Sequence, residues 1–248
     1  MEPVKVLCGD CRLRNLCVPH GLAGRELKQL EEIVKQPRPL QRGQRLYLPG
    51  DKFHHLFIVR SGTLKTYTTT SSGEQQIIGF HLPGELVGLD GVSDGAYTCT
   101  AETMEMTSVC ELPFTKLETV MGQIKILQHQ VHKLMGKELL TDQQLLLQLG
   151  KMNAEQRVAA FLLNIACRFH QRGFSASEFH LPMTRSDIGN YLGLAVETVS
   201  RQFSHFQELD IVKVSRKHII INKPEFLRTI TNPDSTSKFQ QDREATHC

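Results

Sequence analysis

A change of hydrophobic periodicity near residue 113 constrains the fold of this chain most. From Pro37 to about Thr115 the sequence consists of short alternating runs, such as RLYLPGD and HLFIVRSGTLKTYTTT, separated by Gly, Pro, Asp and Ser. This pattern is typical of short β-strands joined by turns, and a small barrel or jelly roll is the natural way to close such a sheet. After Pro113 the apolar residues recur at helical spacing. The sequence therefore predicts an α+β chain in which a β-domain precedes a helical part.

Helical segments are predicted on both sides of the β-rich stretch. A short amphipathic helix is expected from Gly24 to Lys35, and a much longer one from about Leu117 to Leu149, where no proline occurs. Because a compact β-domain cannot cover so long a helix, its apolar stripe needs a partner. The stripe has the spacing of a coiled-coil seam with one charge in it, which predicts a dimer interface: Met135, Leu139, Asp142, Leu146 and Leu149.

The last third of the chain predicts two consecutive helices and a hairpin. After an amphipathic helix in AEQRVAAFLLNIACRF, Thr184 is placed to cap a second helix, with Asp187 reaching back from three residues later. That helix is expected to end near Gly193, and the next to run to about Leu209, which is a helix-turn-helix layout. The following IVKVSRKHIIINK predicts two strands around residues 215–217, the wing of a winged helix.

The second helix of this pair carries residues suited to reading DNA. Its inward stripe is Val199, Phe203 and Phe206. On the opposite face, Arg201 can bind guanine through two hydrogen bonds, Glu197 can accept from cytosine, and Ser200 can bond a base or a phosphate. An ordinary solvated helix face is the alternative, since the net charge of +3 is too small to imply a nucleic-acid partner. The helix-turn-helix context and the wing favour DNA binding.

Three of the seven cysteines crowd into CGDCRLRNLC, at positions 8, 11 and 17. The N-terminus does not resemble a signal peptide, and the apolar runs are shorter than a membrane span needs. We therefore expect a cytoplasmic chain without membrane contact, in which thiols are kept reduced. Clustered cysteines in that setting more often bind a metal or react as thiols than form disulfides. Isolated cysteines such as Cys99 are expected in the core.

The order of these segments resembles the cyclic-AMP receptor superfamily of bacterial transcription factors. With FHLPGELVGL, NAEQRVAAFLLN and TRSDIGNYLGLAVETVSR, the chain is similar, from Cys8 to about Ile221, to the FNR- and ANR-type regulators of the anaerobic switch. The resemblance implies a cluster-ligand segment, a β-roll of the cyclic-nucleotide-binding type, a dimerisation helix and a winged helix-turn-helix. Their expected ranges are 1–20, 21–116, 117–152 and 153–231, and residues 232–248 are expected to form a disordered tail.

In this family three N-terminal cysteines with C-x2-C-x5-C spacing and one distant cysteine hold an oxygen-labile 4Fe-4S cluster. The matching residues are Cys8, Cys11, Cys17 and, in SVCELPF, Cys110. Four thiolates also suit a structural zinc ion, although zinc motifs are usually built from two close pairs. The resemblance favours the cluster, and a zinc-stapled or thiol-redox-sensing transcription factor of the same superfamily is the alternative.

The resemblance further implies the partners of the protein. With the cluster bound, the chain is expected to form a homodimer, opposed by repulsion between the two copies of Asp142. The dimer is expected to bind a palindrome of the type TTGAT-N4-ATCAA and to control anaerobic metabolism genes. Gly73 and Glu74 in SSGEQQ match a family surface that contacts RNA polymerase, although Ser-Gly also suits an ordinary hairpin turn.

Two other functions are disfavoured by missing motifs. Relatives that bind cyclic nucleotides carry an Arg-Ser pair after their G-E-L motif, whereas GAYTCTAET, which follows Gly84-Glu85-Leu86 here, has no arginine. A buried phosphate would lack its counter-charge, so no cyclic-nucleotide activation is expected. An enzyme is disfavoured because the sequence has no Gly-rich phosphate loop, nucleophile elbow or His-rich metal motif.

Overall fold

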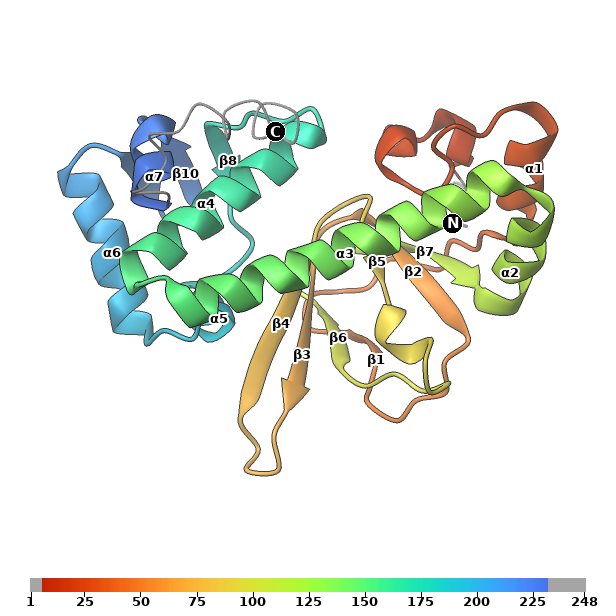
Figure 1. Cartoon of the computed structure of the whole chain (residues 1–248), viewed down its shortest axis with the longest axis horizontal. Coiled ribbons are helices and arrows are strands. Elements are labelled where there is room, and N and C mark those ends of the chain that lie inside the picture. The colour runs from red at the N-terminus through yellow and green to blue at the C-terminus, as the bar shows by residue number, and fades with distance from the viewer. Residues whose placement is uncertain (1–5, 232–248) are drawn as a thin grey trace. The chain divides into compact units, whose positions relative to one another are not determined.

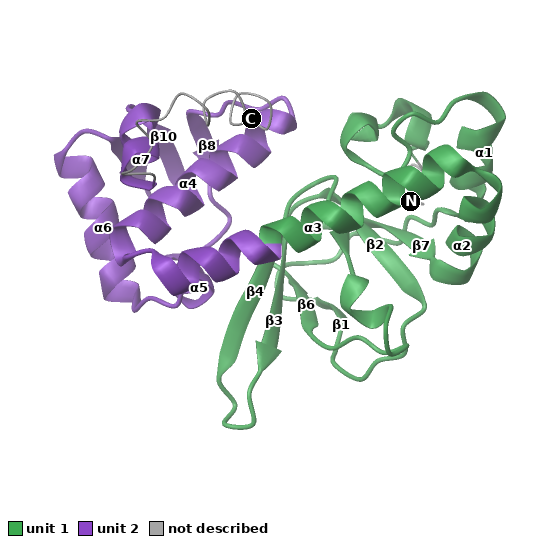
Figure 2. Ribbon diagram, viewed as in Figure 1, with its two compact units in different colours: residues 1–141 green, residues 142–248 purple. Residues whose placement is uncertain are grey.

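The computed structural model describes residues 6–231, so the predicted disorder of residues 232–248 lies outside the described part of the chain. The chain divides into two compact units, residues 1–141 and 142–248, and the division falls within one long helix (Figure 2). The predicted α+β class is confirmed, because a β-rich part is followed by a helical part (Figure 1). Between residues 6 and 231, no helix has the length and apolar content required to span a bilayer.

The first unit contains the predicted β-roll, which consists of two antiparallel sheets. One sheet has the order β1-β6-β3-β4 and the other β5-β2-β7. Their bounds are β1 Arg45–Tyr47, β2 His55–Ser61, β3 Leu64–Thr69, β4 Gln75–His81, β5 Leu86–Val87, β6 Thr100–Thr103 and β7 Ser108–Pro113. The central strand β2 is buried on both faces, because Leu56 and Ile58 belong to one core and Phe57 and Val59 to the other, as the strand period of two requires. Aromatic rings fill the interior, where Tyr47 and Tyr97 stack with their centroids 3.9 Å apart, beside the buried Cys99.

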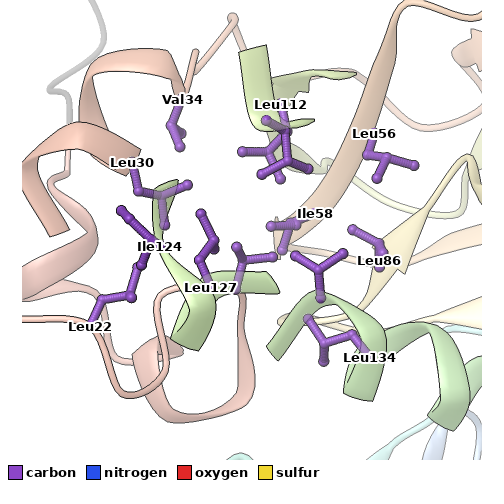
Figure 3. Packing of buried hydrophobic residues seen from close by; sticks show 13 residues of the cluster. Leu22, Leu30, Val34, Leu56, Ile58, Leu86, Leu112, Ile124, Leu127 and Leu134 are labelled. Carbon is purple, nitrogen blue, oxygen red and sulfur yellow. The ribbon is translucent and has the colours of Figure 1, made fainter. Parts of the chain in front are cut away.

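Three helices pack against the β5-β2-β7 sheet and share a second core with it (Figure 3). They are α1 Gly24–Ile33, α2 Phe114–Gln123 and α3 Lys125–Lys151; the short 3-10 turns η1 Cys8–Asp10 and η2 Arg14–Leu16 precede them, and a third, η3 Leu89–Gly91, follows β5. The expected short helix at Gly24 is confirmed. The continuous helix predicted from Leu117 is wrong, because Ile124 has an extended backbone (φ −121°, ψ 96°) that separates α2 from α3. The side chain of Ile124 is 4% exposed, and its burial in this core compensates for the interrupted helix.

The second unit confirms the predicted winged helix-turn-helix. Its elements are α4 Ala154–Gln171, β8 Glu178–His180, α5 Arg185–Leu192, α6 Val196–Glu208, β9 Val212–Ser215, β10 His218–Ile221 and α7 Pro224–Thr231. Thr184 and Asp187 cap α5 reciprocally, and Gly193 ends this helix in the left-handed region (φ 62°). The wing is the β9–β10 hairpin. A third strand, β8, pairs with β10 and was not predicted from the sequence.

Candidate cysteine cavity and nucleic-acid interface

The four cysteines singled out by the resemblance line one cavity. Cys8 lies in η1, Cys11 and Cys17 follow η1 and η2, and Cys110 lies in the middle of β7, opposite Ile58 of β2. The remaining wall is mostly apolar, with two arginines and one amide: Val6, Leu13, Arg14, Val18, Pro19, Leu30, Val34, Gln36, Ile58, Val59, Arg60 and Leu112. The fold thus brings together thiols from two distant parts of the sequence.

Burial dominates the acidity of these thiols. It raises the pKa of Cys17 far above its ordinary value, and the neighbouring Cys110, Cys8 and Cys11 add to the rise. Burial also raises the pKa of Cys110 to about 11, against the opposing effect of the Arg60 cation. Thiolates in so apolar a cavity are unfavourable unless a positive centre compensates them. A metal centre does so, because it deprotonates the thiols that bind it.

The cavity has the donor set of a four-thiolate metal centre, which suits a 4Fe-4S cluster or a zinc ion. Among residues 6–231, no three His, Cys, Asp or Glu side chains are close enough together to hold a single metal ion.

Hydrogen bonds attach the cysteine segment to two helices. The Gly9 amide donates to the Glu31 carboxylate of α1 (2.9 Å), and the Gln130 amide of α3 donates to the Cys17 carbonyl (3.1 Å). Gln130 is 6% exposed although it is polar, and Val18 next to Cys17 belongs to the same core as α3. A hydrogen bond and a shared core therefore connect the cysteine segment to α3.

The predicted seam residues of α3 are largely exposed in the single chain. Met135, Leu139 and Leu146 are 36%, 59% and 69% exposed, and burial raises the pKa of the Asp142 carboxyl above its ordinary value. Leu149 is only half-buried, and its carbonyl accepts a hydrogen bond from Arg157 (2.9 Å). Two exposed leucines that the sequence analysis did not include, Leu140 and Leu147, widen the apolar stripe beyond a narrow seam.

The predicted DNA-reading residues all lie on the exposed face of α6. The inward stripe of this helix, Val199, Phe203 and Phe206, is at most 2% exposed. On the other face Glu197, Ser200 and Arg201 are exposed, and the Ser200 hydroxyl donates to the Val196 carbonyl (2.8 Å). The Arg201 guanidinium reaches the Thr198 hydroxyl (3.2 Å). These side chains are available to a ligand, as a base-reading surface requires.

Two contacts missed by the sequence analysis fix α5 against α6. The Arg185 guanidinium lies 3.3 Å from the centroid of the Phe203 ring, a cation–π contact, and burial lowers the pKa of Arg185 to about 10. Gly189 lies against the turn, where an added Cβ would be 2.6 Å from the Leu194 carbonyl oxygen. Only glycine allows the two helices to approach this closely.

The predicted polymerase-contact residues lie at the tip of the β3–β4 hairpin (Figure 1). Gly73 has a positive φ of 85°, and its amide donates to the Thr70 carbonyl (2.9 Å). The Thr70 amide donates in turn to the Glu74 carbonyl (2.8 Å). The geometry is that of a hairpin turn, and both Gly73 and Glu74 are exposed.

A carboxylate is hydrogen-bonded to the backbone of the GAYTCTAET stretch. Asp90 accepts hydrogen bonds from the backbone amides of Thr98 (2.7 Å) and Cys99 (3.2 Å). The Tyr47 hydroxyl donates to the same side chain (3.3 Å). Two amides of the GAYTCTAET stretch are therefore bonded to a carboxylate of the β-roll itself.

Comparisons with known proteins agree with this architecture. Residues 37–123 match the family model of the cyclic nucleotide-binding domain, and residues 156–230 that of the Crp-like helix-turn-helix domain. The chain is 49% identical over 214 residues to the transcriptional activator protein anr of Pseudomonas aeruginosa, covering 86% of this chain and 88% of the relative. It is 46% identical over 220 residues to the fumarate and nitrate reduction regulatory protein of Shigella dysenteriae (89% and 88% covered). Among solved structures, FixK2 from Bradyrhizobium japonicum matches with a TM-score of 0.72 at 29% identity, covering 80% of this chain and 97% of that one.

Proposed function

The chain belongs to the CRP/FNR family of bacterial transcription regulators, and from this premise we propose that it is an oxygen-responsive, DNA-binding regulator of anaerobic metabolism. The proposal rests on one observation: Cys8, Cys11, Cys17 and Cys110 line the same cavity. Four thiols around an apolar cavity are the donor set of a 4Fe-4S cluster. These residues would hold the cluster, and when bound it supplies a centre that oxygen destroys.

The family favours a cluster over a single zinc ion, because the similar proteins include anr and the fumarate and nitrate reduction regulatory protein. The order of the cysteines agrees, since zinc motifs are usually built from two close pairs, whereas here three cysteines are close together and Cys110 is distant in the sequence. A zinc-stapled or thiol-redox-sensing regulator remains the alternative, and metal analysis distinguishes the three.

The chain's own residues suggest how the state of the cavity reaches the dimerisation surface. Gln130 bonds the Cys17 carbonyl from α3, and the core that contains Val18 continues along α3 to Leu134. The exposed stripe of Met135 and Leu139 begins one residue later. We propose that filling the cavity fixes this part of α3 and so favours a parallel homodimer through α3, against the repulsion between the two Asp142 carboxylates.

In the dimer, two copies of α6 would enter successive major grooves about one helical turn apart. Glu197, Ser200 and Arg201 would read the half-sites of a TTGAT-N4-ATCAA palindrome, and the hairpin tip with Gly73 and Glu74 would contact RNA polymerase. We propose no activation by cyclic nucleotides, because the Asp90 carboxylate already occupies the amides of Thr98 and Cys99 and would repel a phosphate.

The test compares two β-roll cysteines in protein purified without oxygen. Cys110→Ser removes a proposed ligand, whereas Cys99→Ser changes a cysteine in the aromatic core, 2% exposed and 3.8 Å from the Tyr47 hydroxyl. We expect Cys110→Ser to lose both the brown colour and the gel shift of a duplex that carries the palindrome, and Cys99→Ser to keep both. Wild-type DNA binding by a colourless Cys110→Ser variant would contradict the proposal.

A further inference from the structure

An arginine that the cluster proposal does not use lies on the same face of the sheet as Cys110. Ile58 of β2 lies opposite Cys110 of β7, and Arg60 follows Ile58 by two residues. The strand period of two therefore places Arg60 on the face that carries Ile58 and Cys110. The Arg60 side chain lines the cavity that Cys110 also lines, and its charge acts on the Cys110 thiol.

The Arg60 guanidinium is part of a hydrogen-bonded latch at the edge of the cavity. It donates to the Gln36 side-chain oxygen (2.9 Å). The same oxygen accepts the Val6 amide (3.1 Å), and the Gln36 amide group donates to the Val6 carbonyl (2.6 Å). Gln36 is itself held in place because the neighbouring Lys35 pairs with the Glu111 backbone, next to Cys110. The latch thus fastens the segment before Cys8 to the wall that carries Cys110.

The cavity wall carries positive charge, which would compensate the negative charge of a cluster bound by its cysteines. Two side chains of its lining are cationic, Arg14 and Arg60, and the Arg14 guanidinium is engaged by the Leu22 carbonyl. Four thiolates outweigh the positive charge of a 4Fe-4S core, so the assembled site is an anion. In an apolar cavity such an anion needs a counter-charge, and the net charge and hydrogen bonds around a cluster set its reduction potential.

From this geometry, and resting on the proposed cluster function, we propose that Arg60 is a positioning residue of the cysteine cavity with two separable effects. Its charge stabilises the anionic thiolate site and raises the reduction potential of the bound cluster. Its hydrogen bond to Gln36 holds the Val6 segment over the cavity and limits the access of oxygen and water. Gln36 shares only the second effect, because it carries no charge.

Four variants separate the two effects. Arg60→Gln removes the charge, Arg60→Lys keeps it, Gln36→Ala removes the latch alone, and Arg42→Gln removes a charge from the exposed loop before β1. The reduction potential of the cluster is measured by redox titration without oxygen. The rate of bleaching in air, and hydrogen–deuterium exchange of residues 6–12, report on access. Thermal unfolding verifies that each variant is folded.

We expect Arg60→Gln to lower the potential and to weaken cluster binding roughly tenfold, the lower end of the effects of residues that support metal ligands. Arg60→Lys should restore the potential, and Arg42→Gln should leave it unchanged. Gln36→Ala should speed bleaching and exchange of residues 6–12 while the potential stays near that of the wild type. If folded Arg60→Gln has the wild-type potential and the wild-type cluster affinity, the proposed role of Arg60 is wrong.

The same experiment separates this inference from the function on which it rests. A wild-type protein that takes up no iron and sulfide overturns both. A wild-type protein that binds the cluster, together with an Arg60→Gln variant indistinguishable from it, overturns only the role of Arg60. If Arg60→Gln does not fold, Arg60→Lys and Gln36→Ala still test the latch. Lysine keeps a donor for Gln36, so of these two variants Gln36→Ala should accelerate exchange of residues 6–12 more, and equal exchange in both would overturn the latch.

Discussion

Replacing Asp142 with alanine should convert the apo-protein from a monomer to a dimer in air. Asp142 lies on α3, three residues after Leu139 and four before Leu146, where the spacing of the seam requires an apolar residue. The side chains of the two leucines are 59% and 69% exposed. In a parallel dimer with two-fold symmetry, each of these residues would face its own copy. Burial already raises the pKa of the Asp142 carboxyl in the single chain, so its charged form becomes still less favourable when a second carboxylate approaches.

The size of the effect follows from two opposing terms. Covering the exposed part of Leu139 and Leu146 contributes roughly 1–2 kcal/mol per side chain, so four leucines contribute about 4–8 kcal/mol. This is comparable to the lower range of the free-energy cost of association, about 4–15 kcal/mol. Two carboxylates about 6 Å apart repel each other by about 3 kcal/mol at an effective dielectric constant of about 20. Removing the repulsion should therefore tighten the dimer roughly a hundredfold.

Sedimentation equilibrium of apo-protein in air measures this dissociation constant. Asp142→Ala and Asp142→Asn should both lower it about a hundredfold, and Gln143→Ala, at the exposed neighbouring position, should not. Because proximity raises the pKa of Asp142, wild-type dimerisation should strengthen as the pH falls toward the ordinary carboxyl pKa, and the variants should lose this dependence. A monomeric Asp142→Ala protein would refute the assignment of Asp142 to the seam.

Three further outcomes are expected. Gly189→Ala places a Cβ 2.6 Å from the Leu194 carbonyl oxygen and should lower the unfolding free energy by about 1–3 kcal/mol. Urea denaturation measures this, and an unchanged midpoint would mean that the turn accommodates the methyl group. Arg201→Ala should weaken binding to the palindrome by about 1–3 kcal/mol and relax the preference at one base pair, measured by gel shift on single-base variants; equal loss on all sequences would assign Arg201 to a phosphate. Gln130→Leu removes the hydrogen bond to the Cys17 carbonyl and should lower the unfolding free energy of the first unit by about 1 kcal/mol. It should also speed hydrogen–deuterium exchange of residues 15–18, and an unchanged exchange rate there would argue against the link to α3.

The parts of the fold predicted correctly from the sequence are those governed by local signals. Thr184 and Asp187 form a capping box over four residues, and Gly193 ends the helix in a conformation that glycine favours. The spacing of Val199, Phe203 and Phe206 alone indicated the buried face of α6. Such features depend on neighbours within one or two helical turns, so no tertiary information is needed to find them.

The features that the sequence analysis missed are set by tertiary contacts. Ile124 interrupts the long helix although no proline lies between residues 114 and 149, and its side chain is buried in the core that three helices share with the sheet. β8 becomes a strand only by pairing with β10 about forty residues later, as Phe179 does with Ile219. The position of Arg60 near Cys110 depends on the register of β2 against β7, which no local pattern encodes.

The candidate site shows the same division. Cys8, Cys11 and Cys17 attract attention by their proximity in the sequence, whereas Cys110 lies 93 residues beyond Cys17 and was identified only through the family resemblance. The structure brings all four to one cavity because Cys110 is opposite Ile58, whose side chain belongs to the core that also holds the cysteine segment. A resemblance was needed where the partners are far apart in the chain.

The most direct test of the central claim is an iron, acid-labile sulfide and zinc analysis, with an absorption spectrum, of the protein purified without oxygen. The account predicts about four irons and four sulfides per chain and a broad brown absorbance that bleaches in air, all lost in Cys110→Ser. A colourless protein with one zinc ion per chain would contradict the cluster and leave a zinc-stapled DNA-binding regulator in its place.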